Sequence, residues 1–314
     1  MNSTKLQGLI AATYTPLDDD GQVNLSQIPQ MVEGLLASGI TGLYVCGSTG
    51  EGMSLSTEER KAVAAAYVQA TKKRVPVIVQ VGHNSLAEAK QLAKHAEEIG
   101  ADVISATCPS YFKINDINTL IDSMSEIASG APGLPFYYYH IPILTGSSLD
   151  MVEFLAKAGE RIPTLTGLKY TDTKLHEFQE CFEFENGKYD VVWGCDEMLL
   201  GALATGAKGA IGSTYNIAAP LYLRIIELFK SGEIEQAREM QKLSINMIRA
   251  IGKYPFHSGM KEVLGMLGVD CGTCRLPQPP LAENDASTLK EKLNAIGFFD
   301  WSVNFSPKNI EQTV

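Results

Sequence analysis

The chain has 314 residues, of which 45% are hydrophobic and 20% are charged, and its formal net charge is −10. This negative charge argues against nucleic acid or an anionic membrane as a partner, because both are themselves densely negative. No apolar run reaches the length of a membrane span, and the stretch from Met1 to Lys5 lacks the pattern of a secretory signal. We therefore expect a cytoplasmic protein whose cysteines stay reduced.

The first half of the chain alternates short apolar runs with helical patterns. Strands are predicted over residues 9–14, 42–46, 75–81, 102–106 and 134–139, with helical patterns over 28–39, 56–71, 85–100 and 118–128 and after residue 148. Ser56 with Glu59, and Ser85 with Glu88, have the spacing of a capping box. Each serine is therefore expected to begin a helix.

The second half adds three more predicted strands, over residues 165–169, 191–193 and 209–211. Eight strands separated by helices, with about thirty residues per pair, fit either a closed β/α barrel or a long doubly wound sheet. The loop from Tyr14 to Asp18 lacks the glycine-rich turn that a doubly wound nucleotide-binding sheet carries after its first strand. The sequence therefore favours a (β/α)8 TIM barrel.

Beyond about Phe229 the strand patterns stop. Helical patterns cover residues 234–251, 258–267 and 286–295. We expect an all-helical C-terminal extension, so that the chain divides into a barrel over residues 1–230 and an extension over residues 231–314.

Within that extension, Cys271 and Cys274 have the C-x-x-C spacing of redox and zinc sites. No second pair follows at ligand spacing, and a proline-rich connector comes next, so a structural role is favoured. The sequence also lacks a G-x-G-x-x-G motif after a strand and a Walker lysine. We expect neither a metal nor an organic cofactor.

Lys169 ends the sixth predicted strand, where alternation places it on one face with Leu165 and Gly167. Loss of water on that face would lower the pKa of the lysine and leave free amine to attack a carbonyl. A lysine at a strand end more often extends into solvent, so this segment alone leaves both possibilities open.

The ends of the predicted strands carry further reactive groups. In a β/α barrel these ends converge on one mouth, which would bring Lys169 close to Tyr139 and to the glycine-rich turn from Gly47 to Gly50. An amine can form a Schiff base, a phenol can transfer protons, and turn amides with hydroxyls can bind a carboxylate. This set of groups predicts imine chemistry on a carbonyl that lies next to a carboxylate.

Together these motifs resemble the pyruvate-dependent class I aldolases, the family of dihydrodipicolinate synthase and N-acetylneuraminate lyase. Gly47-Ser48-Thr49-Gly50-Glu51 is similar to the family's turn for the pyruvate carboxylate, with Ser48 and Thr49 as binding residues. Tyr139 is similar to its proton-transferring tyrosine, and Gly167-Leu168-Lys169 to its Schiff-base motif. The resemblance covers nearly the whole chain and implies a barrel with a helical extension, a homotetramer and no cofactor.

Leu144 distinguishes two branches of that family. Synthases usually carry an arginine there for the carboxylate of a second substrate, whereas lyases carry an apolar residue. The lyases also have Gly-x-Asp-Glu after the seventh strand and Gly-Ser-Thr-Tyr-Asn after the eighth, as this chain has at residues 194–197 and 212–216. The resemblance thus implies cleavage of sialic acid to N-acetylmannosamine and pyruvate. It also implies that the polyhydroxyl chain of the sugar acid is bound by Thr171, Gly194, Asp196, Glu197 and Ser213.

Other interpretations remain for single positions. Asp196 and Glu197 precede a helical pattern, where the helix dipole alone favours acidic residues. Gly212-Ser213 fits a phosphate cradle of the kind that barrels form after strands seven and eight. Tyr111 lies on a loop that lends a tyrosine to the neighbouring subunit's site in related enzymes, although the residues beside it depart from the double-tyrosine pattern.

Two further functions also stay open. One is another pyruvate-dependent 2-keto-acid aldolase or dehydratase. The other is a non-catalytic barrel that binds a sugar acid or regulates another process. His140 and His257 are not required by the aldolase chemistry and are interpreted as packed residues.

Overall fold

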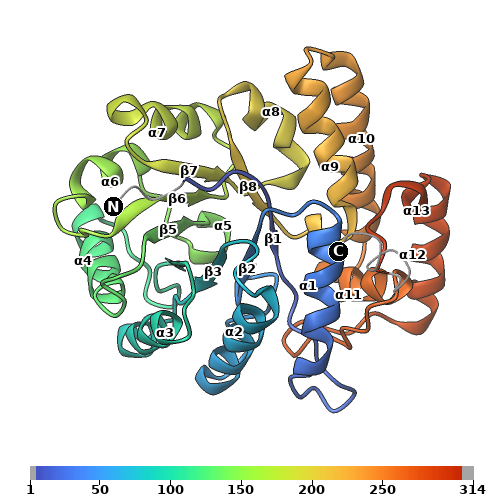
Figure 1. Ribbon diagram of the computed structural model, residues 1–314, viewed down its shortest axis with the longest axis horizontal. Helices are drawn as coiled ribbons and strands as arrows, with labels where there is room; N and C mark the ends of the chain where they lie inside the picture. The colour runs from blue at the N-terminus through green and yellow to red at the C-terminus, as the bar shows by residue number, and fades with distance from the viewer. Residues whose placement is uncertain (1–4, 306–314) are drawn as a thin grey trace.

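The computed structural model describes residues 5–305. Its strands form one closed parallel barrel in chain order, with the last strand paired to the first (Figure 1). The closed barrel confirms the (β/α)8 fold and excludes the doubly wound sheet, which stays open. The strands are β1 (Gly8–Ala12), β2 (Gly42–Val45), β3 (Val77–Gln80), β4 (Val103–Ala106), β5 (Phe136–His140), β6 (Leu165–Tyr170), β7 (Asp190–Trp193) and β8 (Gly209–Gly212).

Helices surround the barrel and follow the strands along the chain (Figure 1). The helices between and after the strands are η1 (Leu25–Gln27), α1 (Ile28–Ala37), α2 (Thr57–Thr71), α3 (Leu86–Glu98), α4 (Ile117–Ala128), α5 (Pro142–Thr145), α6 (Met151–Ala158), α7 (Leu175–Gly187), η2 (Asp196–Met198), α8 (Leu199–Ala204) and α9 (Tyr215–Lys230). The extension consists of α10 (Ile234–Ile251), α11 (Phe256–Met266), α12 (Glu283–Ala295) and α13 (Phe298–Trp301).

The extension packs against one side of the barrel. Helix α10 lies along α9, and α11 and α13 also contact α9. Within the described residues no strand follows β8, as predicted, and α10 has the predicted bounds. The last part of the predicted extension, residues 306–314, lies outside the described residues. None of the helices in residues 5–305 combines the length and apolar character that a membrane span requires.

Two strands begin later than predicted because a proline precedes each of them. The third begins at Val77 after Pro76, and the fifth at Phe136 after Pro135. Proline has no N–H for the ladder and contributes only its carbonyl, which here accepts hydrogen bonds from the neighbouring strands. The first strand also ends earlier than predicted, at Ala12.

One of the two predicted capping boxes forms completely. Ser56 and Glu59 exchange both hydrogen bonds at the start of α2. At α3 only half of the box forms: Ser85 accepts from the backbone N–H of Glu88. The Glu88 carboxylate instead accepts a hydrogen bond of 2.7 Å from the hydroxyl of Thr57, which ties α3 to α2.

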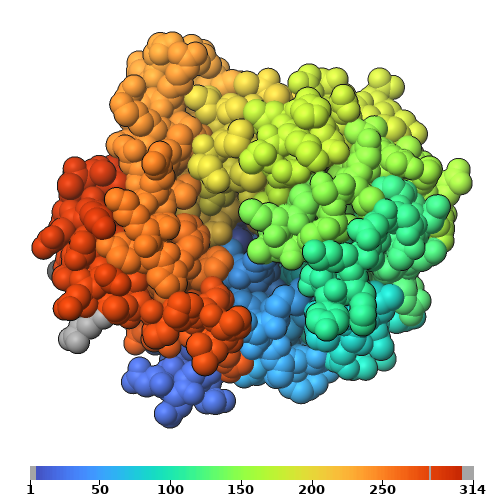
Figure 2. Space-filling view, turned by 180° about the vertical axis from the view of Figure 1, so that it is seen from behind, coloured from blue at the N-terminus to red at the C-terminus, as the bar shows by residue number. Residues whose placement is uncertain are grey.

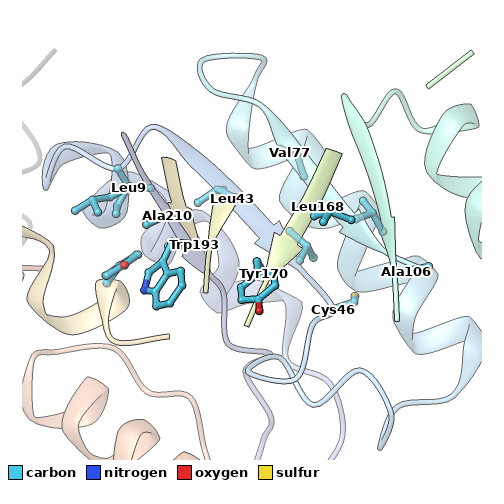
Figure 3. Packing of buried hydrophobic residues seen from close by; sticks show 14 of the residues in the cluster. Leu9, Leu43, Cys46, Val77, Ala106, Leu168, Tyr170, Trp193 and Ala210 are labelled. Carbon is cyan, nitrogen blue, oxygen red and sulfur yellow. The ribbon is translucent and has the colours of Figure 1, made fainter. Parts of the chain in front are cut away.

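Alternation along each strand divides the core into two layers. One layer lies between strands and helices and contains Leu168, Tyr170 and Trp193 (Figure 3). The other fills the barrel interior and contains Tyr137 and Tyr139. Full burial of such large side chains contributes about 1.5–3 kcal/mol each. Because neighbours in a strand point to opposite faces, burial of Leu168 and Tyr170 against the helices directs the residue between them into the barrel.

Candidate active site

That residue is Lys169, which lies in register with Tyr139 of β5 and Val192 of β7. Only 4% of its surface is exposed. Burial lowers the pKa of Lys169 from 10.5 to about 7, although the carboxylate of Asp196 opposes the shift. The side chain therefore does not extend into solvent, and a large share of it carries a free amine at neutral pH.

Two tyrosine rings enclose the amine. The Nζ atom of Lys169 lies 3.9 Å from the ring centroid of Tyr139 and 4.0 Å from that of Tyr44. The two rings meet edge to face with their centroids 5.7 Å apart. Tyr44 was not predicted as a site residue from the sequence, although its inward position on β2 could have indicated it. Its hydroxyl donates to the Oγ of Ser105 at 3.1 Å, which fixes the ring.

The phenol of Tyr139 is protonated at neutral pH. Burial raises its pKa to about 12, and the nearby hydroxyls of Ser48 and Thr171 partly oppose this rise. Tyr139 thus lies between the amine of Lys169 and two hydroxyl groups from the ends of β2 and β6. This arrangement suits a group that passes protons.

The turn after β2 is held from two sides. Thr49 is buried and donates from Oγ1 to the Oγ of Ser213, after β8, at 3.0 Å. The hydroxyl of Thr15 donates to the carbonyl of Gly50 at 2.7 Å. Three of the predicted binding residues, Ser48, Thr49 and Ser213, are therefore brought together across the mouth.

Asp196 lies at the start of η2 and is buried. Its Oδ2 accepts from the backbone N–H of Thr214 at 2.9 Å and from the hydroxyl of the same residue at 2.6 Å. Its Oδ1 has no partner among the described residues. Burial raises the pKa of Asp196 to about 6. A Cβ atom on Gly212 would lie 1.8 Å from Oδ1, so the carboxylate takes this position only beside a glycine.

Thr171 and Gly194, which directly follow β6 and β7, also place a side-chain oxygen against a glycine. A Cβ on Gly194 would lie 1.9 Å from the Oγ1 of Thr171. That hydroxyl is buried, and no residue within 5–305 is its hydrogen-bond partner. Gly194 therefore makes room for a hydroxyl that keeps its hydrogen-bonding capacity.

The structure does not bring Glu197 and Tyr111 to this group. Glu197 is exposed and lines a groove with Gly201, Ile234 and Arg238. Successive residues of a 3₁₀ turn point in directions about 120° apart, which explains why Asp196 is buried and its neighbour is not. Tyr111 is 79% exposed on the loop between β4 and α4.

A cavity of about 320 Å³ opens beside the turn after β2. Its polar lining includes Ser48, Gln80, Thr107 and His257, and its apolar lining includes Leu144. Lys169 and Tyr139 are not among its lining residues, so Ser48 is the link between the cavity and the reactive pair. Figure 2 shows a hollow on this side of the molecule between the orange C-terminal helices and the green segments around β5 and α6.

The two histidines of interest differ in their surroundings. His257 of α11 lines the cavity, and its Nδ1 lies 3.2 Å from the hydroxyl of Tyr14. His140 is fully buried in the layer between strands and helices, and burial lowers its pKa to about 4. His140 is thus a packed residue, as expected.

Within the described residues, one group of side chains has donor atoms close enough to hold a metal ion. It consists of His140, Asp172 and Glu177, whose donor atoms lie within 4.8 Å of one another. Both carboxylates already have partners: the Nζ of Lys174 lies 3.4 Å from Asp172, and the hydroxyl of Tyr170 donates to Glu177. The group is separate from Lys169, on the outer face of the strands.

The C-x-x-C pair consists of two buried, free thiols. Burial raises the pKa of Cys271 to about 12, and that of Cys274 also rises. Thiols that stay protonated are poor nucleophiles and poor metal ligands. The structural interpretation of this motif is therefore supported.

Together, the barrel, the buried lysine and the strand-end hydroxyls define a β/α-barrel enzyme with a buried amine of lowered pKa at its mouth. The family model described as "Dihydrodipicolinate synthetase family" matches residues 5–296. The chain belongs to this family.

Two related proteins and one solved structure align with most of the chain. It is 42% identical over 277 residues to "N-acetylneuraminate lyase A" of Xenopus laevis, covering 87% of this chain and 90% of the relative. It is 38% identical over 303 residues to "N-acetylneuraminate lyase" of Homo sapiens, covering 95% of each chain. The solved structure of "Proteus mirabilis N-acetylneuraminate lyase" superposes with a TM-score of 0.92 at 40% identity, covering 94% of this chain and all of that one.

Proposed function

We propose that this chain is a Schiff-base aldolase that reversibly cleaves N-acetylneuraminate to N-acetylmannosamine and pyruvate. The observation that carries the proposal is the Nζ atom of Lys169, which is buried, has a pKa of about 7 and lies 3.9 Å from the ring of Tyr139. The names of the relatives at 38–42% identity support the choice of substrate.

The reaction begins when the free amine of Lys169 attacks the C2 ketone of the open-chain sugar acid and water leaves. The protonated imine then accepts the electron pair of the C3–C4 bond as that bond breaks. Tyr139 relays the proton of the C4 hydroxyl: its phenol oxygen accepts that proton while the phenol gives its own, by way of a neighbouring hydroxyl, to the substrate carboxylate. Protonation of the enamine at C3 and hydrolysis release pyruvate. Besides these side chains, the scheme needs only water and the substrate's own groups.

The remaining site residues bind the two ends of the substrate. Ser48 and Thr49 hold the carboxylate next to the imine carbon. Thr171 and Asp196 bind hydroxyls of the polyol, because each offers a buried oxygen with no partner among the described residues. Gly194 and Ser213 complete this part of the site, whereas the exposed Glu197 lies outside it.

The branch of the family follows from Leu144, which lines the cavity in place of an arginine. A second substrate with its own carboxylate has no charged partner at that position. A synthase-like aldolase or dehydratase is therefore the less favoured candidate. A non-catalytic barrel is disfavoured because it has no need for an amine with a lowered pKa.

We further propose a cytoplasmic homotetramer in which the barrel comprises residues 1–230 and the extension residues 231–314. The rings of Tyr111 and Phe112 stack edge to face and are 79% and 82% exposed, which suits a subunit interface. In such an assembly Tyr111 would reach the site of a neighbouring subunit. Light scattering on the purified protein measures the assembly directly.

Covalent trapping tests the proposed function. The protein is incubated with pyruvate, reduced with borohydride and digested for peptide mass spectrometry. One reduced pyruvate per chain is expected, on Lys169. An unmodified Lys169 at saturating pyruvate would leave only the non-catalytic alternative.

A further inference from the structure

The turn that carries Ser48 and Thr49 has an unfavourable backbone. Cys46 and Glu51, which flank it, have φ values of 59° and 56°, in the left-handed region. Each such residue costs about 1–2 kcal/mol when it bears a side chain. This conformation persists only where the surroundings hold it.

Glu51 is held by residues of the C-terminal extension. Its Oε1 lies 2.7 Å from the Nζ of Lys261 on α11, and both side chains are 1% exposed. Its Oε2 accepts a hydrogen bond of 2.8 Å from the backbone N–H of Arg275. The Nζ of Lys261 also donates to the carbonyl of Thr273 at 2.9 Å. The left-handed residue is thus tied to two distant segments of the chain.

The connector that supplies these contacts is itself fixed to the barrel. The guanidinium of Arg275 donates to both carboxylate oxygens of Glu59 at 2.5 and 2.7 Å, and to the carbonyl of Gly21 at 2.8 and 2.9 Å. The backbone N–H of Leu17 donates to the carbonyl of Cys271 at 3.0 Å. The segment with the C-x-x-C spacing therefore encloses the Glu51–Lys261 pair.

The net stability gained from such a pair is small. Removing two charges from water costs several kcal/mol per ion, and apolar replacements of a whole buried pair are often neutral or stabilising. A pair at this position is better explained by the geometry that it imposes on the adjoining turn.

We infer that Glu51 and Lys261 are positioning residues: through their ion pair, the C-terminal extension holds the Ser48–Thr49 turn in the shape that binds a carboxylate. Neither residue touches the reacting atoms. The identity of that carboxylate as pyruvate rests on the proposed function. Loss of the pair should weaken carboxylate binding and leave the chemistry of Lys169 unchanged.

The test uses Lys261→Met, which keeps the length of the side chain and removes its charge. Trapping with borohydride is measured over a range of pyruvate concentrations on the full-length protein. We expect the half-saturating pyruvate concentration to rise about tenfold, while the trapping rate at saturation stays within twofold of wild type. Glu51→Gln is expected to raise the half-saturating pyruvate concentration by the same factor, again with little change in the trapping rate at saturation.

The double variant Glu51→Gln/Lys261→Met guards against simple misfolding, because it leaves no unpaired charge in the interior. It should recover stability toward urea but not pyruvate affinity. Hydrogen exchange of the peptide spanning residues 46–52 gives a readout without ligand, and exchange should be faster in the single and double variants than in wild type.

Asp190→Asn is the matched control. Asp190 is also a buried carboxylate, but it lies at the start of β7, at the opposite end of the barrel, and accepts from Tyr137 and Leu6. Asp190→Asn should lower the stability toward urea and leave the half-saturating pyruvate concentration unchanged. Two results would overturn the inference. One is a half-saturating pyruvate concentration and a hydrogen-exchange rate of residues 46–52 that match wild type in both Lys261→Met and the double variant. The other is an equal shift of both quantities in Asp190→Asn. Wild-type protein that pyruvate does not label would refute the proposed function instead, and the exchange data would still decide the inference.

Discussion

Each end of the barrel interior contains a buried tyrosine and a buried aspartate, but the two pairs differ in their hydrogen bonds. Near the amino ends of the strands, Tyr137 donates to the Oδ2 of Asp190 at 2.7 Å, and the same oxygen accepts from the N–H of Leu6 at 2.8 Å. Near the carboxyl ends, Tyr139 and Asp196 are not bonded to each other, and one oxygen of Asp196 lacks a partner in the described part of the chain.

Burial raises the pKa of both tyrosines and both aspartates, so desolvation does not distinguish the two ends. What distinguishes them is hydrogen-bonding capacity. At the amino end the phenol and the carboxylate bind each other, which stabilises the fold. At the carboxyl end the equivalent groups remain available to a substrate. A buried polar group is therefore a better sign of function when its partners are missing than when its pKa is merely shifted.

The tyrosine pair offers the sharpest test of this comparison. Tyr139→Phe should lower the rate of N-acetylneuraminate cleavage about 10²- to 10³-fold, because it removes the group that we propose to transfer the proton. Tyr137→Phe should leave that rate within about threefold but lower the free energy of unfolding by about 1–3 kcal/mol, because it takes a donor from a buried carboxylate. Steady-state kinetics and urea unfolding measure both. Equal kinetic losses in the two variants would contradict the comparison.

The aspartates provide a second test. Asp196→Asn keeps the shape but weakens charge-assisted hydrogen bonds worth about 1.5–3 kcal/mol, so cleavage should fall about ten- to a hundredfold. Glu197→Gln should leave cleavage close to wild type, because this side chain is exposed outside the group around Lys169. Pyruvate trapping at Lys169 should survive in both variants, since neither change reaches the lysine or the turn after β2. If trapping fell together with cleavage, Asp196 would support the lysine or the fold rather than the sugar.

The pH dependence of imine formation tests the state of Lys169. A lysine with a pKa of about 7 loses its proton as the pH rises through 7, so the fraction of free amine grows about tenfold between pH 6 and pH 8 and then levels off. Timed samples are quenched into borohydride at one fixed pH, so that the reduction step is the same in each. A rate that still climbed tenfold per pH unit above pH 8 would indicate a lysine with an ordinary pKa.

The smallest effect is expected at Leu144. Wild-type protein should condense pyruvate with N-acetylmannosamine faster than with aspartate semialdehyde. Leu144→Arg should raise the semialdehyde rate about three- to tenfold, less than a buried ion pair would give, because the residue is 59% exposed and water screens its charge. Wild-type preference for the semialdehyde would show that the lyase branch was the wrong choice.

Much of the fold could be predicted because its signals are local. Apolar alternation and capping residues located the eight strands and the long helix α10. The position of Lys169 followed from the same alternation, which also fixes its neighbours in register. The predicted starts of the third and fifth strands were wrong because a proline lies within each predicted run.

The rest depends on contacts between distant residues. Lys261 lies on an apolar helix face beside Val263 and Leu264, which marks it as unusual, but nothing in the sequence identifies Glu51 as its partner. The different exposure of Asp196 and Glu197 depends on a short 3₁₀ turn that no periodic pattern predicts.

The tie between Glu51 and Lys261 also has a consequence for the order of events during synthesis. The two residues are separated by about 210 positions, and at about 5–20 residues per second a ribosome needs roughly 10–40 seconds to travel from one codon to the other. During that interval the strands from β3 to β8 emerge one after another and can pair, while the turn after β2 still lacks its anchor. A nascent chain should therefore reach its full affinity for a carboxylate only when α11 and the following connector have left the exit tunnel, at the end of translation rather than with the barrel.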